Sequence, residues 1–180
     1  AVAYQVTDHD GDTADGSLPI DVDDDSPVIG TPNTTVQLDD DNVAGAGGNP
    51  GVGTDPDGTA PDDVQDAVLT GTLAHSYGAD GAGSVLLTGV TGLGTTDTGV
   101  EDSFFYTLNA SGTVLTISQV QDGVAVQVLQ VSLSDTTSGS YTVAQLAPID
   151  HLTGSSENNQ QFAVAYQVTD HDGDTADGSL

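Results

Sequence analysis

The chain of 180 residues contains no lysine, arginine, cysteine, methionine or tryptophan. Without Lys or Arg, the protein has no basic side chains to meet the phosphates of a nucleic acid or the headgroups of an anionic membrane, so charge-driven binding to either is excluded. Without cysteine, neither disulfides nor thiolate metal sites can form. No apolar run approaches the roughly 20 residues that span a bilayer, so membrane insertion is not expected.

The charge that is present is negative. The chain has 28 acidic residues, almost all of them aspartate, and a formal net charge of -28. Aspartate favours turns, whereas glutamate favours helices, so we expect these acidic residues in loops. These carboxylates repel one another, and compensation has to come from dissolved cations. Ca²⁺ accepts about six to eight oxygen ligands, and we expect it as the cofactor. The alternative is an acidic, solvated surface without specific sites.

An internal repeat defines the organisation of the chain. Residues 1–18 (AVAYQVTDHDGDTADGSL) recur unchanged as residues 163–180. Identity at a fixed period is typical of a tandem array, in which each module mainly contacts its neighbours. We therefore expect neighbouring repeats of a longer chain as partners. Residues 1–27 would be the C-terminal hairpin of the preceding repeat plus a linker, and 28–180 one repeat that lacks most of its last strand. Hairpin 1–22 could replace that strand, within the chain or by exchange with another copy.

Alternation of apolar and polar residues predicts strands along most of the chain. Short strands separated by Gly-, Asp- and Pro-rich turns, with little helical periodicity, are typical of an antiparallel, Ig-like β-sandwich. Segment 39–63 is too long for an ordinary connection and is expected to be held by metal, and 64–68 suggests a brief helical turn. The expected strands are 1–7, 18–22, 34–38, 71–77, 84–91, 104–108, 113–119, 125–133, 141–146 and 161–169.

The clearest chemical motif is Asp-His-Asp-Gly-Asp, which occurs once in each copy of the repeat. Alternate aspartates in a tight turn direct their carboxylates to one point, and the glycine allows the sharp bend. The motif resembles the start of an EF-hand loop, but its glycine is fourth instead of sixth and its flanks are strands. We predict a Ca²⁺ loop within a β-hairpin, with a solvated Asp-Gly turn as the alternative. The aspartates are Asp8, Asp10, Asp12, Asp170, Asp172 and Asp174.

The linker supplies a second set of carboxylates. In a sandwich of this kind the last hairpin turns at the end where the chain enters the module. Asp23, Asp24 and Asp25 are therefore expected to approach the second Asp loop and to form with it a Ca²⁺ site that stiffens the joint. Asp39 and Asp41, in the long acidic loop, are a further candidate pair, with a flexible loop as the alternative. The Gly-rich segment 78–83 is predicted to be only a hairpin turn.

Catalysis is not expected from this sequence. The four histidines have no metal-ligand spacing. Asp150 and His151 could belong to a Ser-His-Asp triad, but Ser and Asp are too common in this chain for that coincidence to be informative. A secreted hydrolase would need a convergent pocket that no motif indicates.

Several motifs in a fixed order resemble the repeat domain of type I-secreted, RTX-type giant adhesins of bacteria, the 143-residue repeat family. They are GTL at 71–73, GADGAGSV at 78–85, LAPIDH at 146–151, EN at 157–158 and YQVTDHDGD at 166–174. The resemblance implies Ig-like or cadherin-like modules with Ca²⁺ at and near their junctions. It also implies an extracellular spacer on the bacterial surface that projects a distal ligand-binding region. The longer period here is attributed to insert 39–63.

Two functions remain open at this point. The first is a non-enzymatic, Ca²⁺-stabilised spacer module. The second is a module that itself binds carbohydrate or ice through Ca²⁺. Unchanged repetition favours the spacer, because a ligand-binding tip usually occurs once.

Overall fold

The computed structural model describes residues 1–31, 36, 38, 43, 68–93, 104–150 and 160–180. Within these ranges all regular structure is β-strand, and no helix there could cross a membrane. The expected strand 34–38, the loop 39–63 and the expected helical turn lie largely outside the described residues, and Val68 begins a strand.

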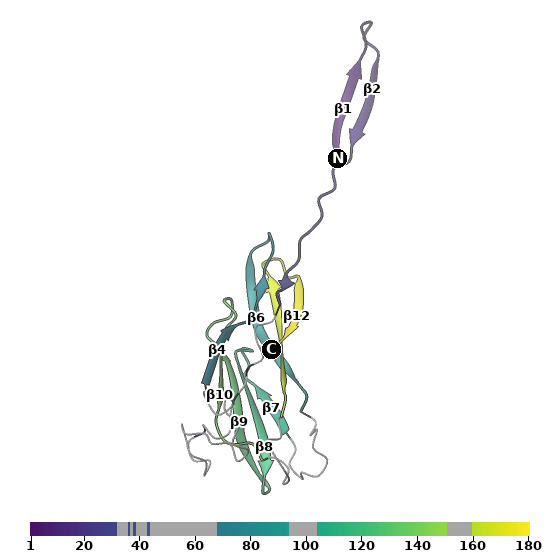
Figure 1. The fold of residues 1–180 in the computed structure, drawn as a ribbon. Coiled ribbons are helices and arrows are strands. Elements are labelled where there is room, and N and C mark those ends of the chain that lie inside the picture. Colours follow the sequence, from purple (N-terminus) through teal and green to yellow (C-terminus); the bar gives the residue numbers. More distant parts are fainter. Residues whose placement is uncertain (32–35, 37, 39–42, 44–67, 94–103, 151–159) are drawn as a thin grey trace.

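Two antiparallel sheets form the body of the protein (Figure 1). The larger sheet has five strands in the order β4-β10-β9-β8-β7, and the smaller has three in the order β12-β11-β6. A short ladder, β3-β5, lies beside them. The strands are β3 Val28–Ile29, β4 Val68–Thr72, β5 His75–Ser76, β6 Ala82–Thr91, β7 Phe104–Leu108, β8 Val114–Gln121, β9 Val124–Leu133, β10 Ser140–Gln145, β11 Ala163–Asp170 and β12 Thr175–Ser179.

One core lies between the two sheets. Strand β11 alternates strictly, so that Val164, Tyr166 and Val168 are buried while the residues between them are partly exposed. These side chains join Leu115 and Ile117 of β8 in one cluster. Period-two alternation with one buried face is what a two-layer sandwich requires. The predicted all-β, antiparallel β-sandwich is confirmed.

The prediction of a strand over residues 18–22 was wrong. Strand β2 is Thr13–Leu18, and it pairs along β1, Val2–Thr7. The turn closes early because Asp8 Oδ1 accepts the N–H groups of Gly11 and Asp12, and Pro19 has no N–H to donate to a ladder.

The same displacement applies to the second copy of the hairpin. Strand β12 pairs with residues 165–169 of β11 and ends one residue before Leu180. The second copy of the strand expected at 18–22 therefore also lies earlier in the chain, at Thr175–Ser179. Segment 71–77, expected as one strand, is divided between β4 and β5.

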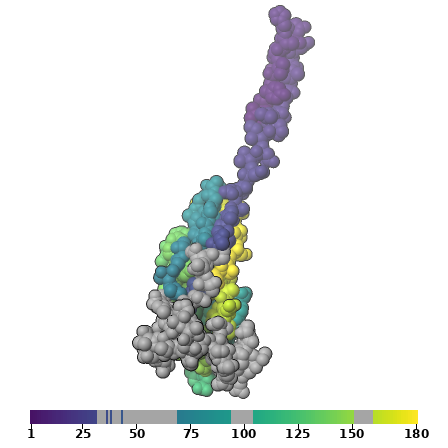
Figure 2. All heavy atoms as spheres, viewed as in Figure 1, coloured from purple at the N-terminus to yellow at the C-terminus, as the bar shows by residue number. Residues whose placement is uncertain are grey.

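The N-terminal hairpin β1–β2 stands apart from the sandwich. An extended segment, residues 19–27, joins it to β3 (Figure 1). In the space-filling view the hairpin projects well beyond the body (Figure 2). All residues of β1 are exposed.

Candidate metal centre

The turn between β11 and β12 is tied together by the buried side chain of Asp170. Its Oδ1 accepts the N–H groups of Gly173 at 3.0 Å and of Asp174 at 2.8 Å. Gly173 has φ +110°, a conformation that L side chains rarely adopt. Asp170 itself is only 2% exposed, and its Oδ2 is buried without a hydrogen-bond partner. A buried, unpaired carboxylate oxygen is costly unless a cation or a proton meets it.

Five carboxylates converge at this end of the sandwich. Oxygens of Asp170, Asp172 and Asp174 lie within 4.8 Å of one another. Oxygens of Asp24, Asp80 and Asp172 do so as well. The two groups share Asp172, and we call the five residues together the acidic centre: Asp24, Asp80, Asp170, Asp172 and Asp174.

Close packing of two turns builds the acidic centre. The pairing of β6 with β11 shifts register between Thr169 and Asp170. There the backbone of β11 lies so close to Gly83 that a Cβ at that position would collide with the carbonyls of Thr169 and Asp170. Beyond it, the N–H of His171 donates to the carbonyl of Gly81 at 3.2 Å. The turn that carries Asp80 is thereby held against the Asp loop.

The linker is fixed to the same end of the sandwich. Asp25 Oδ2 accepts the N–H of Ala79 at 2.6 Å. Gly78 has φ +76°, and a Cβ there would meet the Asp25 carboxylate, so only glycine suits this contact. Pro27 is buried. These contacts hold the neighbouring Asp24 in the acidic centre.

The negative charges of the acidic centre raise the pKa of two of its own carboxyl groups. Burial, followed by the negative charges of Asp24, Asp170, Asp25 and Asp174, raises the pKa of Asp80. Its Oδ2 is buried without a hydrogen-bond partner. The raised pKa and the unpartnered buried oxygen both indicate a site that favours a bound proton or a bound cation over bare carboxylates.

The pKa of Asp172 is raised too. The first cause is its contact with Asp170, because two carboxyls can share a hydrogen bond only when one is protonated. Desolvation and the charges of Asp170, Asp24 and Asp80 act in the same direction.

The acidic centre suits Ca²⁺ among the common metal ions. All of its ligands are oxygens, which hard cations prefer, and it combines a tight loop with two further segments, as flexible Ca²⁺ coordination allows. Two buried carboxylate oxygens, on Asp80 and Asp170, lack a hydrogen-bond partner. The residues present therefore fit Ca²⁺, with backbone carbonyls and water to complete the shell.

The structure brings together four of the six aspartates that the sequence indicated at the joint between linker and Asp loop. Asp24, Asp170, Asp172 and Asp174 converge. Asp25 lies beside them but binds a backbone N–H. Asp23 is exposed and belongs to none of the acidic clusters found among the described residues. Asp39 and Asp41 lie outside those residues.

Asp80 was missed by the sequence reasoning. It lies in the segment that was interpreted only as a hairpin turn. The available signal was an acidic residue among glycines, in a turn on the same end of the sandwich as the Asp loop.

The first Asp loop has the same local geometry without the other partners. Oxygens of Asp8, Asp10 and Asp12 lie within 4.8 Å of one another, and all three residues are exposed. A hydrogen bond with the Asp10 side chain, and then backbone N–H groups including that of Asp12, lower the pKa of Asp8. No carboxylate from another described segment joins this cluster.

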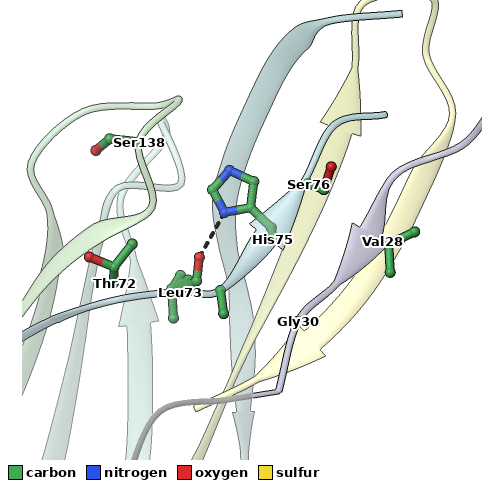
Figure 3. Close-up of a pocket in the computed structure, with 8 residues that line it drawn as sticks. Val28, Gly30, Thr72, Leu73, His75, Ser76 and Ser138 are labelled. Carbon is green, nitrogen blue, oxygen red and sulfur yellow. Dashed lines mark hydrogen bonds between the residues drawn. The ribbon is translucent and has the colours of Figure 1, made fainter. Parts of the chain in front are cut away.

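A pocket beside β3 and β5 is a separate feature (Figure 3). Its titratable side chain, His75, has Nδ1 at 2.7 Å from the carbonyl of Leu73, which places a proton on Nδ1. Ser138, on the rim, donates to Asp135 at 2.7 Å. The histidine is thus oriented by a backbone carbonyl and not by a carboxylate. The lining residues are Val28, Gly30, Thr72, Leu73, Ala74, His75, Ser76 and Ser138.

Comparison with known proteins assigns the chain to a family. Residues 35–180 match DUF5801, a domain of unknown function, and the chain belongs to this family. The matched region covers the whole second Asp loop and the turn that carries Asp80. No curated protein and no solved structure matches the chain.

Proposed function

We propose that the chain is a Ca²⁺-stabilised structural spacer module of a secreted bacterial surface adhesin, in which Ca²⁺ at the joint between repeats stiffens the array and a distal region binds the ligand. The observation that carries the proposal is the meeting of linker residue Asp24 with Asp80 and Asp172, beside the buried Asp170. The adhesin class is supported by the motifs that resemble giant-adhesin repeats.

The role of the ion follows from the segments that it would join. The linker, the β5–β6 turn and the β11–β12 turn come from distant parts of the chain and meet only in the folded protein. A cation held there would supply folding free energy and would fix the direction in which the linker leaves the sandwich.

Such a site also suits export followed by folding. In a Ca²⁺-poor compartment the carboxylates repel one another, and the net charge of -28 opposes compaction. Outside the cell, Ca²⁺ would reduce the repulsion within the acidic centre and favour the complete fold.

Calorimetric titration of the whole chain with CaCl₂, beginning from chelated protein, tests the proposal. We expect saturable binding that the triple variant Asp170→Asn, Asp172→Asn, Asp174→Asn abolishes at the acidic centre. A variant of the exposed first loop, Asp8→Asn, Asp10→Asn, Asp12→Asn, is the matched control, because it removes the same three charges from an identical sequence. Equal losses in both variants, or none in either, would contradict the proposal.

The spacer role requires its own measurement. Small-angle scattering should show one defined orientation of β1–β2 relative to the sandwich in Ca²⁺ and a broader distribution in chelator. Binding of the isolated chain to a glycan array would instead favour the carbohydrate-binding alternative.

A further inference from the structure

The two hairpins of the chain share their internal structure as well as their sequence. Tyr4 lies opposite Gly16 as Tyr166 lies opposite Gly178, and the rest of the register agrees. Gln5 donates to Asp15 at 2.8 Å, and its counterpart in the second hairpin makes the same bond at 3.0 Å. Hairpin β1–β2 therefore already has the conformation that β11–β12 has inside the sandwich.

The surroundings of the two hairpins differ completely. Val164, Tyr166 and Val168 of β11 are 5%, 1% and 0% exposed. Their counterparts on β1 are 53%, 56% and 58% exposed, and they form one apolar face without a cover in the described part of the chain. The counterparts are Val2, Tyr4 and Val6.

The structure itself shows what covers such a face. Strand β6 pairs with β11 so that Val164 lies opposite Val90, Tyr166 opposite Leu87 and Val168 opposite Val85. The buried side chains of β11 then join the core formed with the five-stranded sheet. Because β1 has the same residues in the same conformation, an identical strand β6 is the complementary surface for it.

We infer that the apolar face of β1–β2 is a docking surface for a second copy of this sandwich, in which β1 pairs with β6 of that copy and occupies the position of β11. In Figure 1 the Asp loops of both hairpins point in the same direction along the long axis. A second sandwich seated on β1–β2 as the first is seated on β11–β12 lies beyond the linker, in line with the first. The interface is head-to-tail, and it requires a copy whose β6 is not already paired with its own β11, because one β6 strand can hold only one of the two identical hairpins on that side. This inference does not depend on the proposed Ca²⁺ role, because the contacts are apolar and backbone contacts.

The test uses the whole chain and makes matched substitutions in the two identical hairpins. Val164→Ser, Tyr166→Ser, Val168→Ser disables the internal hairpin without changing the charge. Val2→Ser, Tyr4→Ser, Val6→Ser disables the N-terminal hairpin, and a variant with all six substitutions disables both hairpins. Circular dichroism melts and sedimentation equilibrium are measured for each, in chelator and in Ca²⁺.

The first variant should keep its β-structure by accepting β1–β2 of another molecule. Its mass should be that of at least two chains, and its melting temperature should rise with protein concentration. The second variant should be a folded monomer that melts as the parent does, and the combined variant should be unfolded. If the first variant is as unfolded as the combined one, the inference is overturned. A folded monomer would also overturn it, because the hairpin would then have returned to its own sandwich.

A disulfide trap checks the register. Thr169 lies opposite Ser84, so its counterpart Thr7 should lie opposite Ser84 of the second copy. In the first variant, Thr7→Cys with Ser84→Cys should give covalently linked chains on mild oxidation, and the chain has no other cysteine. Gln5→Cys with Ser84→Cys, two residues out of register, is the control and should link far less. Equal linkage by both pairs would contradict the proposed pairing.

Discussion

The stability of the sandwich should depend on Ca²⁺ with a slope that the structure fixes. The acidic centre exists only when the linker and two turns have come together, so an ion there binds the folded state and not the unfolded chain. Above the dissociation constant, each tenfold rise in free Ca²⁺ then adds about 1.4 kcal/mol of unfolding free energy per bound ion. For a domain of roughly 150 residues this corresponds to about 3–6 °C in melting temperature per decade.

The expected number of coupled ions is one. The two acidic groups of the sandwich share Asp172, so we expect one ion between them. The Asp8 loop belongs to a hairpin outside the sandwich, so an ion there adds little to this transition. Scanning calorimetry at constant ionic strength, with free Ca²⁺ buffered from chelated to millimolar, measures the slope. A melting temperature that does not move over this range would refute the reasoning, and a doubled slope would require a second ion.

The variant Asp80→Asn sharpens this prediction because its effect should change sign. In chelator it removes a negative charge from a cluster of like charges, so the variant should melt above the parent. In saturating Ca²⁺ it removes a ligand, so it should melt below the parent. Asp122→Asn is the control: it removes one charge from the turn after β8, where φ is +50° and asparagine is tolerated. A lower melting temperature for Asp80→Asn in both conditions would mean that its carboxylate supports the fold without metal.

Three further predictions concern pH and packing. In Ca²⁺-free buffer the raised pKa values of Asp80 and Asp172 mean that their protonated forms stabilise the fold at acid pH, and this contribution is lost as pH rises through those values. The melting temperature of the parent should therefore fall relative to that of Asp80→Asn between acid and neutral pH. A constant difference between the two melting temperatures over this range would disprove the assignment. Asp135 accepts hydrogen bonds from the N–H groups of Ser138 and Thr137, which lower its pKa. Asp135→Asn should therefore lower the melting temperature at neutral pH, and the difference from the parent should disappear in strong acid as the parent carboxylate protonates. A difference in melting temperature that does not change with pH would argue against this cause. Tyr166→Ala should cost about 3–5 kcal/mol of unfolding free energy in denaturant titrations, whereas Tyr4→Ala, at the identical sequence position, should change it by at most about 0.5 kcal/mol; similar costs would show that Tyr4 is also packed.

The fold was accessible from the sequence wherever alternation and turn chemistry agree. Strand β7 was predicted with its observed bounds, and β6 within two residues, because short segments rich in aromatic or aliphatic residues are followed there by Asn and Gly turns. Strand β2 was not, because Thr13–Leu18 contains Asp, Gly and Ser and has little intrinsic strand preference. It is a strand because it pairs with β1 and because Gln5 hydrogen-bonds to Asp15 across the ladder.

The candidate site divides in the same way. Asp24 and the second Asp loop could be placed together because an antiparallel hairpin must turn at one end of the sandwich. Asp80 could not, because its position depends on a register shift at Asp170 and on the close approach of Gly83, which are tertiary features that no local pattern reports.

The position of the linker decides how the domain would respond to tension. Ladder β3–β5 has only two residue pairs, so a pull on residues 19–27 would load this short ladder first and peel it open. A cation shared by Asp24 and Asp172 would pass the same pull to β11, which is paired with β6 along almost its whole length. Long ladders loaded along their strands resist force in shear. The metal would then set the mechanical strength of the module as well as its angle to the next.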